Sequence, residues 1–200
     1  MVLKICGITN AEDAAAAMDG GATAIGFNFW PRSPRYITPE EAARIESRPG
    51  IRRVGVFVNE APARIEEIGC VVRLDAAQLH GDEVPGAYPA GLAVWKAARV
   101  TTGFDFSAYD DSPAEALVLD GPAGALYGGS GRSFDWGLAA VVRKRIILAG
   151  GLDATNVAEA IAAAHPWGVD ACSRIESAPG KKDHQKMNEF LQAARAALRA

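Results

Sequence analysis

The sequence has few of the residues that build metal sites or disulfide frameworks. Its 200 residues include three cysteines, Cys6, Cys70 and Cys172, an odd number without metal-like spacing. The three histidines are scattered along the chain, so we expect no metal site. Cysteines without paired spacing are typical of a reducing compartment, and we therefore expect a cytoplasmic protein.

The sequence also lacks an excess of positive charge and long apolar runs. The formal net charge of −3 offers no electrostatic reason to expect a nucleic-acid partner. No apolar run approaches the roughly 18–20 residues that span a bilayer. The N-terminus lacks the basic and apolar layout of a signal peptide. We therefore expect neither nucleic acid nor a membrane as a partner.

Short apolar runs alternate with amphipathic runs along the whole chain, of which 49% is hydrophobic. Eight runs are predicted to be strands, because they are short, apolar and bounded by turn residues. They span residues 2–6, 23–29, 51–58, 76–80, 93–98, 115–120, 145–149 and 169–172. Helical patterns follow most of them, the clearest at residues 11–20, 39–48, 62–69, 136–143, 154–164 and 183–198.

Eight strands in a βα rhythm predict an α/β fold, a closed (β/α)8 or TIM barrel, with residues 1–200 as a single domain. A doubly wound open sheet is the alternative. It usually has fewer strands and often opens with a glycine-rich nucleotide turn, which does not follow this first strand. The alternation of strand and helix patterns is least regular after the fifth strand, where residues 103–113 have no helical period. We expect that element to be degenerate, a loop rather than a helix.

Strand parity predicts which side chains face the inside of the barrel. Side chains alternate between the lumen and the helix layer. If Cys6 faces the lumen, so does Lys4, whereas Leu3 and Ile5 face helices. The same rule collects polar residues at the C-terminal strand ends, where the active site of such a barrel lies.

Cys6 ends the first strand and Asp120 the sixth, so the two could face each other across the barrel mouth. Taken alone, a buried structural cysteine and an aspartate capping a turn are the commoner explanations. A base and an acid on opposite sides of a small sugar are what an isomerase needs. An ordinary thiol, with a pKa of about 8.5, is mostly protonated near neutrality. We hypothesise that cationic surroundings, including Lys4, favour the thiolate.

Glycine-rich loops predict a phosphate site. Gly150 and Gly151 follow the seventh strand, and Ser173 lies in a polar loop after the eighth. Barrels often bind phosphate between these two loops through backbone N–H groups, and glycine permits the close approach. A Gly-Gly pair by itself is more often only a turn. Gly129 lies in a further loop, which could cover the phosphate or be a flexible connection.

Two further side chains at strand ends are candidates for ligand contact. Arg35, on the loop after the second strand, could clamp a planar carboxylate or be a solvated surface residue. His80 ends the fourth strand and could contact a ligand or be a hydrogen-bonded wall residue.

Taken together, these segments resemble the phosphoribosylanthranilate isomerases, barrel enzymes of tryptophan biosynthesis. The motifs that carry the resemblance are spread in order over nearly the whole chain, and their order and spacing are more specific than any one of them. They are Lys4-Ile5-Cys6-Gly7-Ile8-Thr9-Asn10, Ser33-Pro34-Arg35-Tyr36-Ile37, Val54-Gly55-Val56-Phe57-Val58-Asn59, Gln78-Leu79-His80-Gly81, Gly128-Gly129-Ser130-Gly131, Phe134-Asp135-Trp136, Leu148-Ala149-Gly150-Gly151-Leu152 and Pro179-Gly180-Lys181-Lys182-Asp183.

The resemblance implies an Amadori rearrangement of N-(5′-phosphoribosyl)anthranilate to a 1-deoxyribulose phosphate, without cofactor or metal. Asp120 matches the general acid that opens the ribose ring, and Cys6 matches the general base that removes the C2′ proton. Arg35 matches the residue that faces the anthranilate carboxylate, and His80 and Asp170 match other pocket residues. The matching phosphate loops contain Gly129, Gly150, Gly151 and Ser173.

The chain departs from the family pattern at two places. After the eighth strand the family usually reads Ser-Ser-Gly-Val-Glu, and this chain has Cys172-Ser173-Arg174-Ile175-Glu176. Arg174 replaces a glycine near the phosphate. If this position needs a positive φ, an arginine there destabilises the loop. Alternatively, the Arg174 guanidinium binds the phosphate directly. Asn28 stands where the family usually has an apolar residue, so it must find partners or face the pocket.

Two other functions fit parts of the pattern. The sugar isomerase of histidine biosynthesis performs the same rearrangement on a substrate with two phosphates. That barrel has a carboxylate where Cys6 stands, and it shows a twofold repeat that this chain lacks. The second alternative is a catalytically silent phosphate-binding barrel. The presence of both Cys6 and Asp120 argues against this function, but Arg174 keeps the alternative open. We expect a small phosphosugar as the partner, and a monomer or homodimer.

Overall fold

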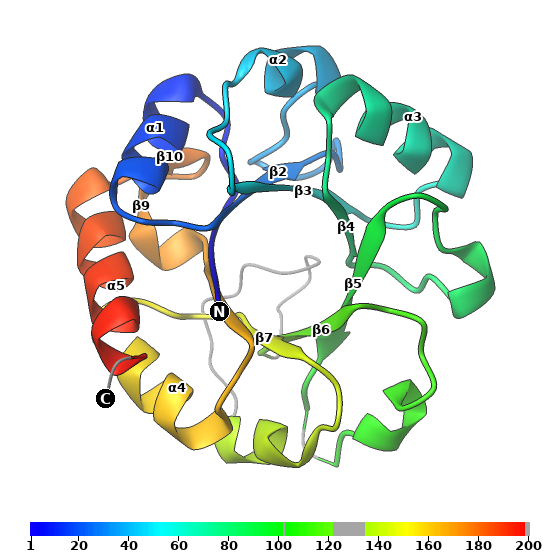
Figure 1. Ribbon diagram of the computed structural model, residues 1–200, viewed down its shortest axis with the longest axis vertical. Coiled ribbons are helices and arrows are strands. Elements are labelled where there is room, and N and C mark those ends of the chain that lie inside the picture. Colours follow the sequence, from blue (N-terminus) through cyan, green and yellow to red (C-terminus); the bar gives the residue numbers. More distant parts are fainter. Residues whose placement is uncertain (102, 122–134, 199–200) are drawn as a thin grey trace.

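Eight parallel strands close into a barrel in sequence order, and β1 pairs with both β2 and β8. The computed structural model of the chain describes residues 1–101, 103–121 and 135–198. Figure 1 looks down the barrel and shows the ring of strands inside a layer of helices. The strands are β1 (Val2–Cys6), β2 (Ala24–Asn28), β3 (Arg52–Phe57), β4 (Ala76–Leu79), β5 (Ala93–Arg99), β6 (Ala116–Asp120), β7 (Ile146–Leu148) and β8 (Gly168–Ala171). The predicted (β/α)8 barrel is therefore confirmed.

Five α-helices and four short 3₁₀ helices connect the strands of the described part of the chain. The α-helices are α1 (Ala11–Asp19), α2 (Pro39–Arg44), α3 (Pro62–Val72), α4 (Val157–Ala164) and α5 (His184–Ala197). The 3₁₀ helices are η1 (Pro85–Ala87), η2 (Phe106–Tyr109), η3 (Trp136–Val141) and η4 (Ser173–Ile175). No helix within these ranges is long and apolar enough to span a bilayer. The degenerate element expected after β5 is confirmed, because only η2 stands there.

Two predicted helices are shorter than expected, and their ends have local causes. The helix predicted at residues 39–48 ends at Arg44, since Ile45 takes an extended backbone, and a turn follows only at Pro49 and Gly50. The helix predicted from residue 154 begins at Val157, because the carboxylate of Asp153 accepts the N–H of Thr155 at 2.8 Å and forms a turn. The expected N-cap of α1 is confirmed, as the Asn10 side chain accepts the N–H of Asp13.

Two apolar clusters separate the lumen from the helix layer, as parity predicts. The lumen cluster contains alternate residues of the strands, and Leu3 and Ile5 belong to the outer cluster beneath the helices. Trp95 is fully buried in the lumen, packs edge-on against Trp167 and donates its indole N–H to Glu115 at 2.8 Å. These aromatic rings fill the lumen, so the polar lumen side chains near the C-terminal strand ends line the mouth.

Arg53 on β3 faces the helix layer and ties two helices to the barrel. Its guanidinium donates to the carbonyl oxygens of Ala42, Ile45 and Val72 at 2.7–2.8 Å. Those carbonyls belong to the last turns of α2 and α3, where backbone acceptors lack helical partners and the helix dipole is negative. A buried guanidinium with three such acceptors therefore satisfies both helix ends at once.

We predict that Arg53→Met lowers the free energy of unfolding by about 2–4 kcal/mol, because three buried carbonyls lose charge-assisted hydrogen bonds. Urea denaturation followed by circular dichroism measures the change. Arg64→Met is the matched control, since Arg64 lies exposed on α3, where it pairs with Glu67 of the same helix. Equal unfolding midpoints for the two variants would contradict the role of Arg53.

Candidate active site

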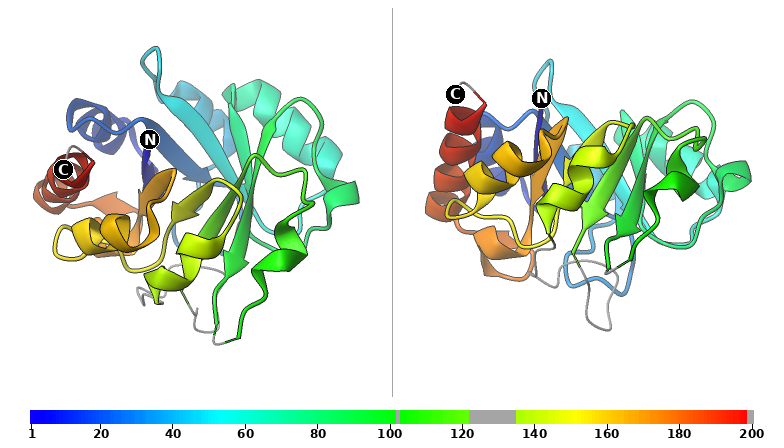
Figure 2. Two further views of the ribbon diagram at one scale, coloured as in Figure 1. Left: turned by 60° about the horizontal axis from the view of Figure 1, so that its bottom comes forward. Right: turned by 90° about the horizontal axis from the view of Figure 1, so that it is seen from below.

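One cavity opens at the C-terminal ends of the strands. These strand ends point to the lower side of the right-hand view of Figure 2. The cavity brings together the predicted site residues of the described chain. They are Cys6, Arg35, His80, Asp120, Gly150, Gly151, Asp170, Ser173 and Arg174. Gly129 lies outside the described residues. The described ranges hold no group of three or more His, Cys, Asp or Glu side chains that could bind a metal ion.

Cys6 is buried at the floor of this cavity, and Cys172 lines the same cavity. Hydrogen bonding by the Cys172 thiol lowers the pKa of Cys6 well below its ordinary value and outweighs burial, and the nearby Lys4 ammonium acts in the same direction. The hypothesis that Lys4 favours the thiolate is thus supported. The part played by Cys172 was missed in the sequence, because no local pattern links two residues so far apart.

Lys4 and Asp170 form a buried ion pair beneath the cavity, with Nζ and Oδ2 2.8 Å apart. Burial favours the neutral amine, but Asp170 and Cys6 outweigh it and raise the pKa of Lys4 above its ordinary value. Burial raises the pKa of Asp170 to about 7 despite the ammonium beside it. Gly26 on β2 leaves room for this cluster, since a Cβ there would lie 3.0 Å from the Cys6 sulfur.

His80 lies between Gln78 and Asp120 on the opposite wall. The Gln78 amide nitrogen is 3.2 Å from His80 Nδ1, and His80 Nε2 is 3.6 Å from Asp120 Oδ2. With the amide as donor, Nδ1 is the acceptor and Nε2 carries the proton that faces Asp120. His80 was expected either to contact a ligand or to be a hydrogen-bonded wall residue. The structure shows that it is hydrogen-bonded and that it also lines the cavity.

Several buried polar atoms of this cavity have no hydrogen-bond partner. Among the described residues, six buried side-chain oxygen or nitrogen atoms lack one, and four of them belong to cavity-lining residues. These four are Gln78 Oε1, His80 Nε2, Asp120 Oδ1 and Asp170 Oδ1. Buried polar groups are nearly always paired in folded proteins, so such a concentration marks a surface that binds a polar ligand.

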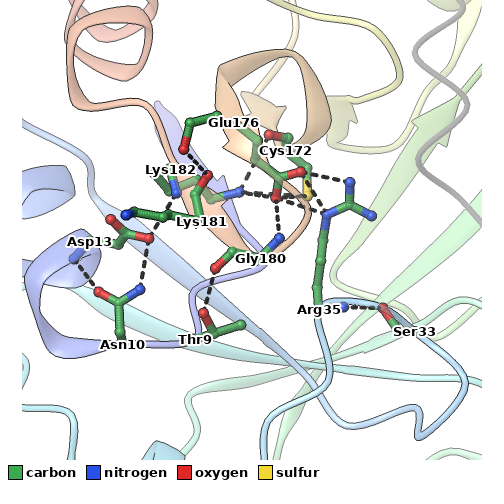
Figure 3. Close-up of polar contacts among 11 residues, drawn as sticks. Thr9, Asn10, Asp13, Ser33, Arg35, Cys172, Glu176, Gly180, Lys181 and Lys182 are labelled. Carbon is green, nitrogen blue, oxygen red and sulfur yellow. Dashed lines mark hydrogen bonds and ion pairs between the residues drawn. The ribbon is translucent and has the colours of Figure 1, made fainter.

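Arg35 is held at the cavity rim by Glu176, as Figure 3 shows. Its Nε and Nη2 donate to the carboxylate at 2.7–3.1 Å, and Lys182 Nζ donates to Oε1 of the same group at 2.9 Å. Glu176 raises the pKa of Arg35 despite partial burial. Arg35 is therefore not a solvated surface residue. Gly7 permits this approach, because a Cβ there would lie 2.7 Å from Arg35 Cδ.

Glu176 and Lys182 were not predicted as site residues. They lie on the hairpin of β9 (Glu176–Ala178) and β10 (Lys181–Lys182), and their side chains are buried. The Lys182 N–H also donates to Asp13 on α1 at 2.9 Å. The sequence motif around Gly180 entered only through the family resemblance, and its two adjacent lysines give no sign that Lys182 is buried.

The loop after β7 holds two glycines in the left-handed region, and the loop after β8 lines the same cavity. Gly150 and Gly151 have φ values of +77° and +68°. Arg174 is not among the three non-glycine described residues with positive φ, so it carries no strain of that kind. Its Nη1 donates to Asp153 at 2.8 Å, and its side chain lines the cavity.

Asn28 finds a partner and also faces the pocket. Its Oδ1 accepts the N–H of Trp30 at 2.9 Å, and it belongs to the cavity lining. The unusual polar residue on β2 therefore satisfies the backbone of the following loop.

Comparison with known proteins agrees with this geometry. A family model described as N-(5'phosphoribosyl)anthranilate (PRA) isomerase matches residues 3–193. A relative from Solibacter usitatus, an N-(5'-phosphoribosyl)anthranilate isomerase, is 69% identical over 200 residues, and the match covers 100% of both chains.

Solved structures of the same enzyme also match. The phosphoribosyl anthranilate isomerase from Thermotoga maritima has a TM-score of 0.90 at 41% identity, covering 98% of this chain and 100% of that chain. Another isomerase, solved in complex with reduced 1-(o-carboxyphenylamino)-1-deoxyribulose 5-phosphate, has a TM-score of 0.84 at 38% identity, with 98% and 100% covered. Because the family model and the full-length relative both extend over nearly the whole chain, the protein belongs to the N-(5′-phosphoribosyl)anthranilate isomerase family.

Proposed function

We propose that the protein converts N-(5′-phosphoribosyl)anthranilate into 1-(2-carboxyphenylamino)-1-deoxyribulose 5-phosphate by an Amadori rearrangement, in tryptophan biosynthesis. One observation carries the proposal. Cys6 on β1 and Asp120 on β6 line the same cavity from strands separated by β7 and β8. Unpartnered buried polar atoms lie beside both. The related isomerase that binds a reduced form of this product supports the choice of substrate.

Asp120 is the general acid of the proposed reaction. It donates a proton to the ribose ring oxygen, the ring C–O bond breaks, and the anthranilate nitrogen forms a Schiff base with C1′. Asp120 Oδ1 has no hydrogen-bond partner among the described residues, which supports its availability to the sugar. His80 Nε2 lies 3.6 Å from Oδ2, beyond hydrogen-bond distance, and its proton stabilises the negative charge that remains on Asp120 after proton transfer.

Cys6 is the general base. Its thiolate removes the C2′ proton, and the electrons of that C–H bond pass to the iminium group to give an enolamine, which tautomerises to the ketone. The iminium already activates the carbon acid, so the base needs only to be ionised and close to C2′. The lowered pKa of Cys6 meets the first condition.

The two ends of the substrate are bound by different loops. The backbone N–H groups at Gly150, Gly151 and Ser173 surround the expected phosphate position, and Arg174 adds a cation at the rim. Arg35 faces the anthranilate carboxylate. Glu176 occupies only Nε and one side of Nη2, and a guanidinium has five N–H donors, so a second carboxylate can be bound as well.

The first prediction concerns the two proton-transfer groups. Purified protein should accelerate the loss of phosphoribosylanthranilate fluorescence, with the substrate generated in place from anthranilate. Cys6→Ser and Asp120→Asn should each lower kcat by about 10²–10⁴, because each removes one positioned proton transfer. Cys70→Ser is the control, since Cys70 is exposed on α3. Wild-type kcat in either active-site variant would refute the role of that residue.

The second prediction concerns pH. The base acts as a thiolate, so kcat/KM should fall as the pH drops through the pKa of Cys6 in the free enzyme. Cys172→Ala removes the hydrogen bond that lowers this pKa, and the acidic limb should therefore move to higher pH. Cys172→Ser keeps a hydrogen-bond donor, so the acidic limb should move less than in Cys172→Ala. Superimposable pH profiles of kcat/KM for the three proteins would rule out this effect of Cys172.

The third prediction separates the two explanations of Arg174. Arg174→Gly should raise KM about threefold to tenfold with little change in kcat, because a partly exposed phosphate contact contributes equally to substrate and transition-state binding. Steady-state kinetics of the two proteins measure the effect. An unchanged KM would exclude a direct contact between Arg174 and the phosphate.

A further inference from the structure

Cys6 and Cys172 are neighbours across the seam where the barrel closes. β1 pairs with β8 in a register that places Lys4 opposite Asp170 and Ile5 opposite Ala171. Continued by one residue, this register brings Cys6 opposite Cys172. Neighbouring strands lie about 4.8 Å apart, and disulfides join residues whose Cα atoms are about 4.4–6.8 Å apart. The backbone spacing therefore suits a disulfide.

The two thiols also point to the same side. Lys4 and Asp170 each stand two residues before a cysteine, and their side chains meet in the lumen at 2.8 Å. Both thiols line the same cavity, and alternation along β1 directs Cys6 to the side of Lys4. Cys172 lies one residue past the end of β8, so its backbone can adjust without the loss of a strand hydrogen bond.

The surroundings of the two thiols assign them different parts in an oxidation. The Cys172 hydrogen bond and Lys4 favour the thiolate at Cys6, which is the form that reacts with peroxide. Cys172 keeps its proton, because burial and its bond to Cys6 raise its pKa, and its sulfur lies 4.0 Å from Glu176 Oε1. Both side chains line the open cavity, so a small oxidant can reach them.

We propose that Cys6 and Cys172 form a reversible disulfide on exposure to hydrogen peroxide, and that this bond switches the enzyme off. The Cys6 thiolate attacks one peroxide oxygen, the O–O bond breaks, and a sulfenic acid and hydroxide result. The Cys172 sulfur then attacks the Cys6 sulfur, the S–O bond breaks, and water leaves. The two thiols lose two electrons and two protons, and the peroxide is reduced to two waters. A dithiol reductant reverses the step.

The disulfide would also protect the site. A sulfenic acid without a neighbouring thiol proceeds to sulfinic and sulfonic acids, which reductants do not restore. Cys172 converts the sulfenic acid into the disulfide before further oxidation takes place. The loss of activity rests on the proposed role of Cys6 as base, whereas formation of the disulfide does not.

The test uses the full chain in a Cys70→Ser background, so that Cys6 and Cys172 are its two remaining cysteines. The reduced protein is treated with one equivalent of hydrogen peroxide and digested with trypsin without reductant. Cleavage leaves Cys6 within residues 5–32 and Cys172 within residues 146–174. We expect a cross-linked pair of these peptides that has lost two hydrogen atoms. Isomerase activity should fall roughly tenfold or more and return with dithiothreitol.

Cys172→Ser in the same background is the matched control, because it keeps a hydroxyl but cannot form the bond. We expect no cross-link, further oxidation of Cys6, and a loss of activity that dithiothreitol does not restore. Absence of the cross-linked peptide in the parent protein would overturn the proposal, and so would full activity in a cross-linked sample. A cross-link in a folded protein that never isomerises the substrate would support the disulfide and refute the proposed function.

Discussion

The buried ion pair between Lys4 and Asp170 joins the first strand of the barrel to the last, and the site above it depends on that junction. Two charges in the lumen are stable only as a pair, because burial of either one alone is costly. Their contact holds β1 and β8 in one register, and that register brings Cys6 beside Cys172. The lowered pKa of Cys6 at the cavity floor therefore follows from the closure of the barrel, which brings the Cys172 thiol and the Lys4 ammonium close to it.

Glu176 holds the rim of the cavity much as Asp170 holds its floor. One carboxylate receives hydrogen bonds from Arg35 after β2 and from Lys182 on β10, so it joins the beginning and the end of the chain. These cations lower the pKa of Glu176 despite its burial, which keeps it an acceptor. Arg35 is thereby presented to the cavity in a defined orientation, and under the proposed function this reduces the entropy that its side chain would lose on binding the substrate carboxylate.

The strands were predicted within one or two residues because each is a short apolar run with turn residues on both sides, and tertiary packing reinforces that preference. The helices were less certain. Residues 136–143 have a helical pattern, but the chain forms a 3₁₀ helix there, η3. Strand parity needed only the alternation of side chains, so the inward direction of Lys4 and the outward direction of Ile5 could both be predicted.

The sequence by itself determined the eight strands, most of the helices that follow them, the faces of the strands and the polar residues at their ends, because these follow from local periodicity and turn chemistry. It also carried enough of the family motifs to indicate the chemistry. Only the tertiary structure decided which of those residues meet. The Lys4–Asp170 pair joins residues 166 positions apart, and the contact of Arg35 with Glu176 spans 141. Such contacts depend on strand register and on closure of the ring, which no local pattern encodes.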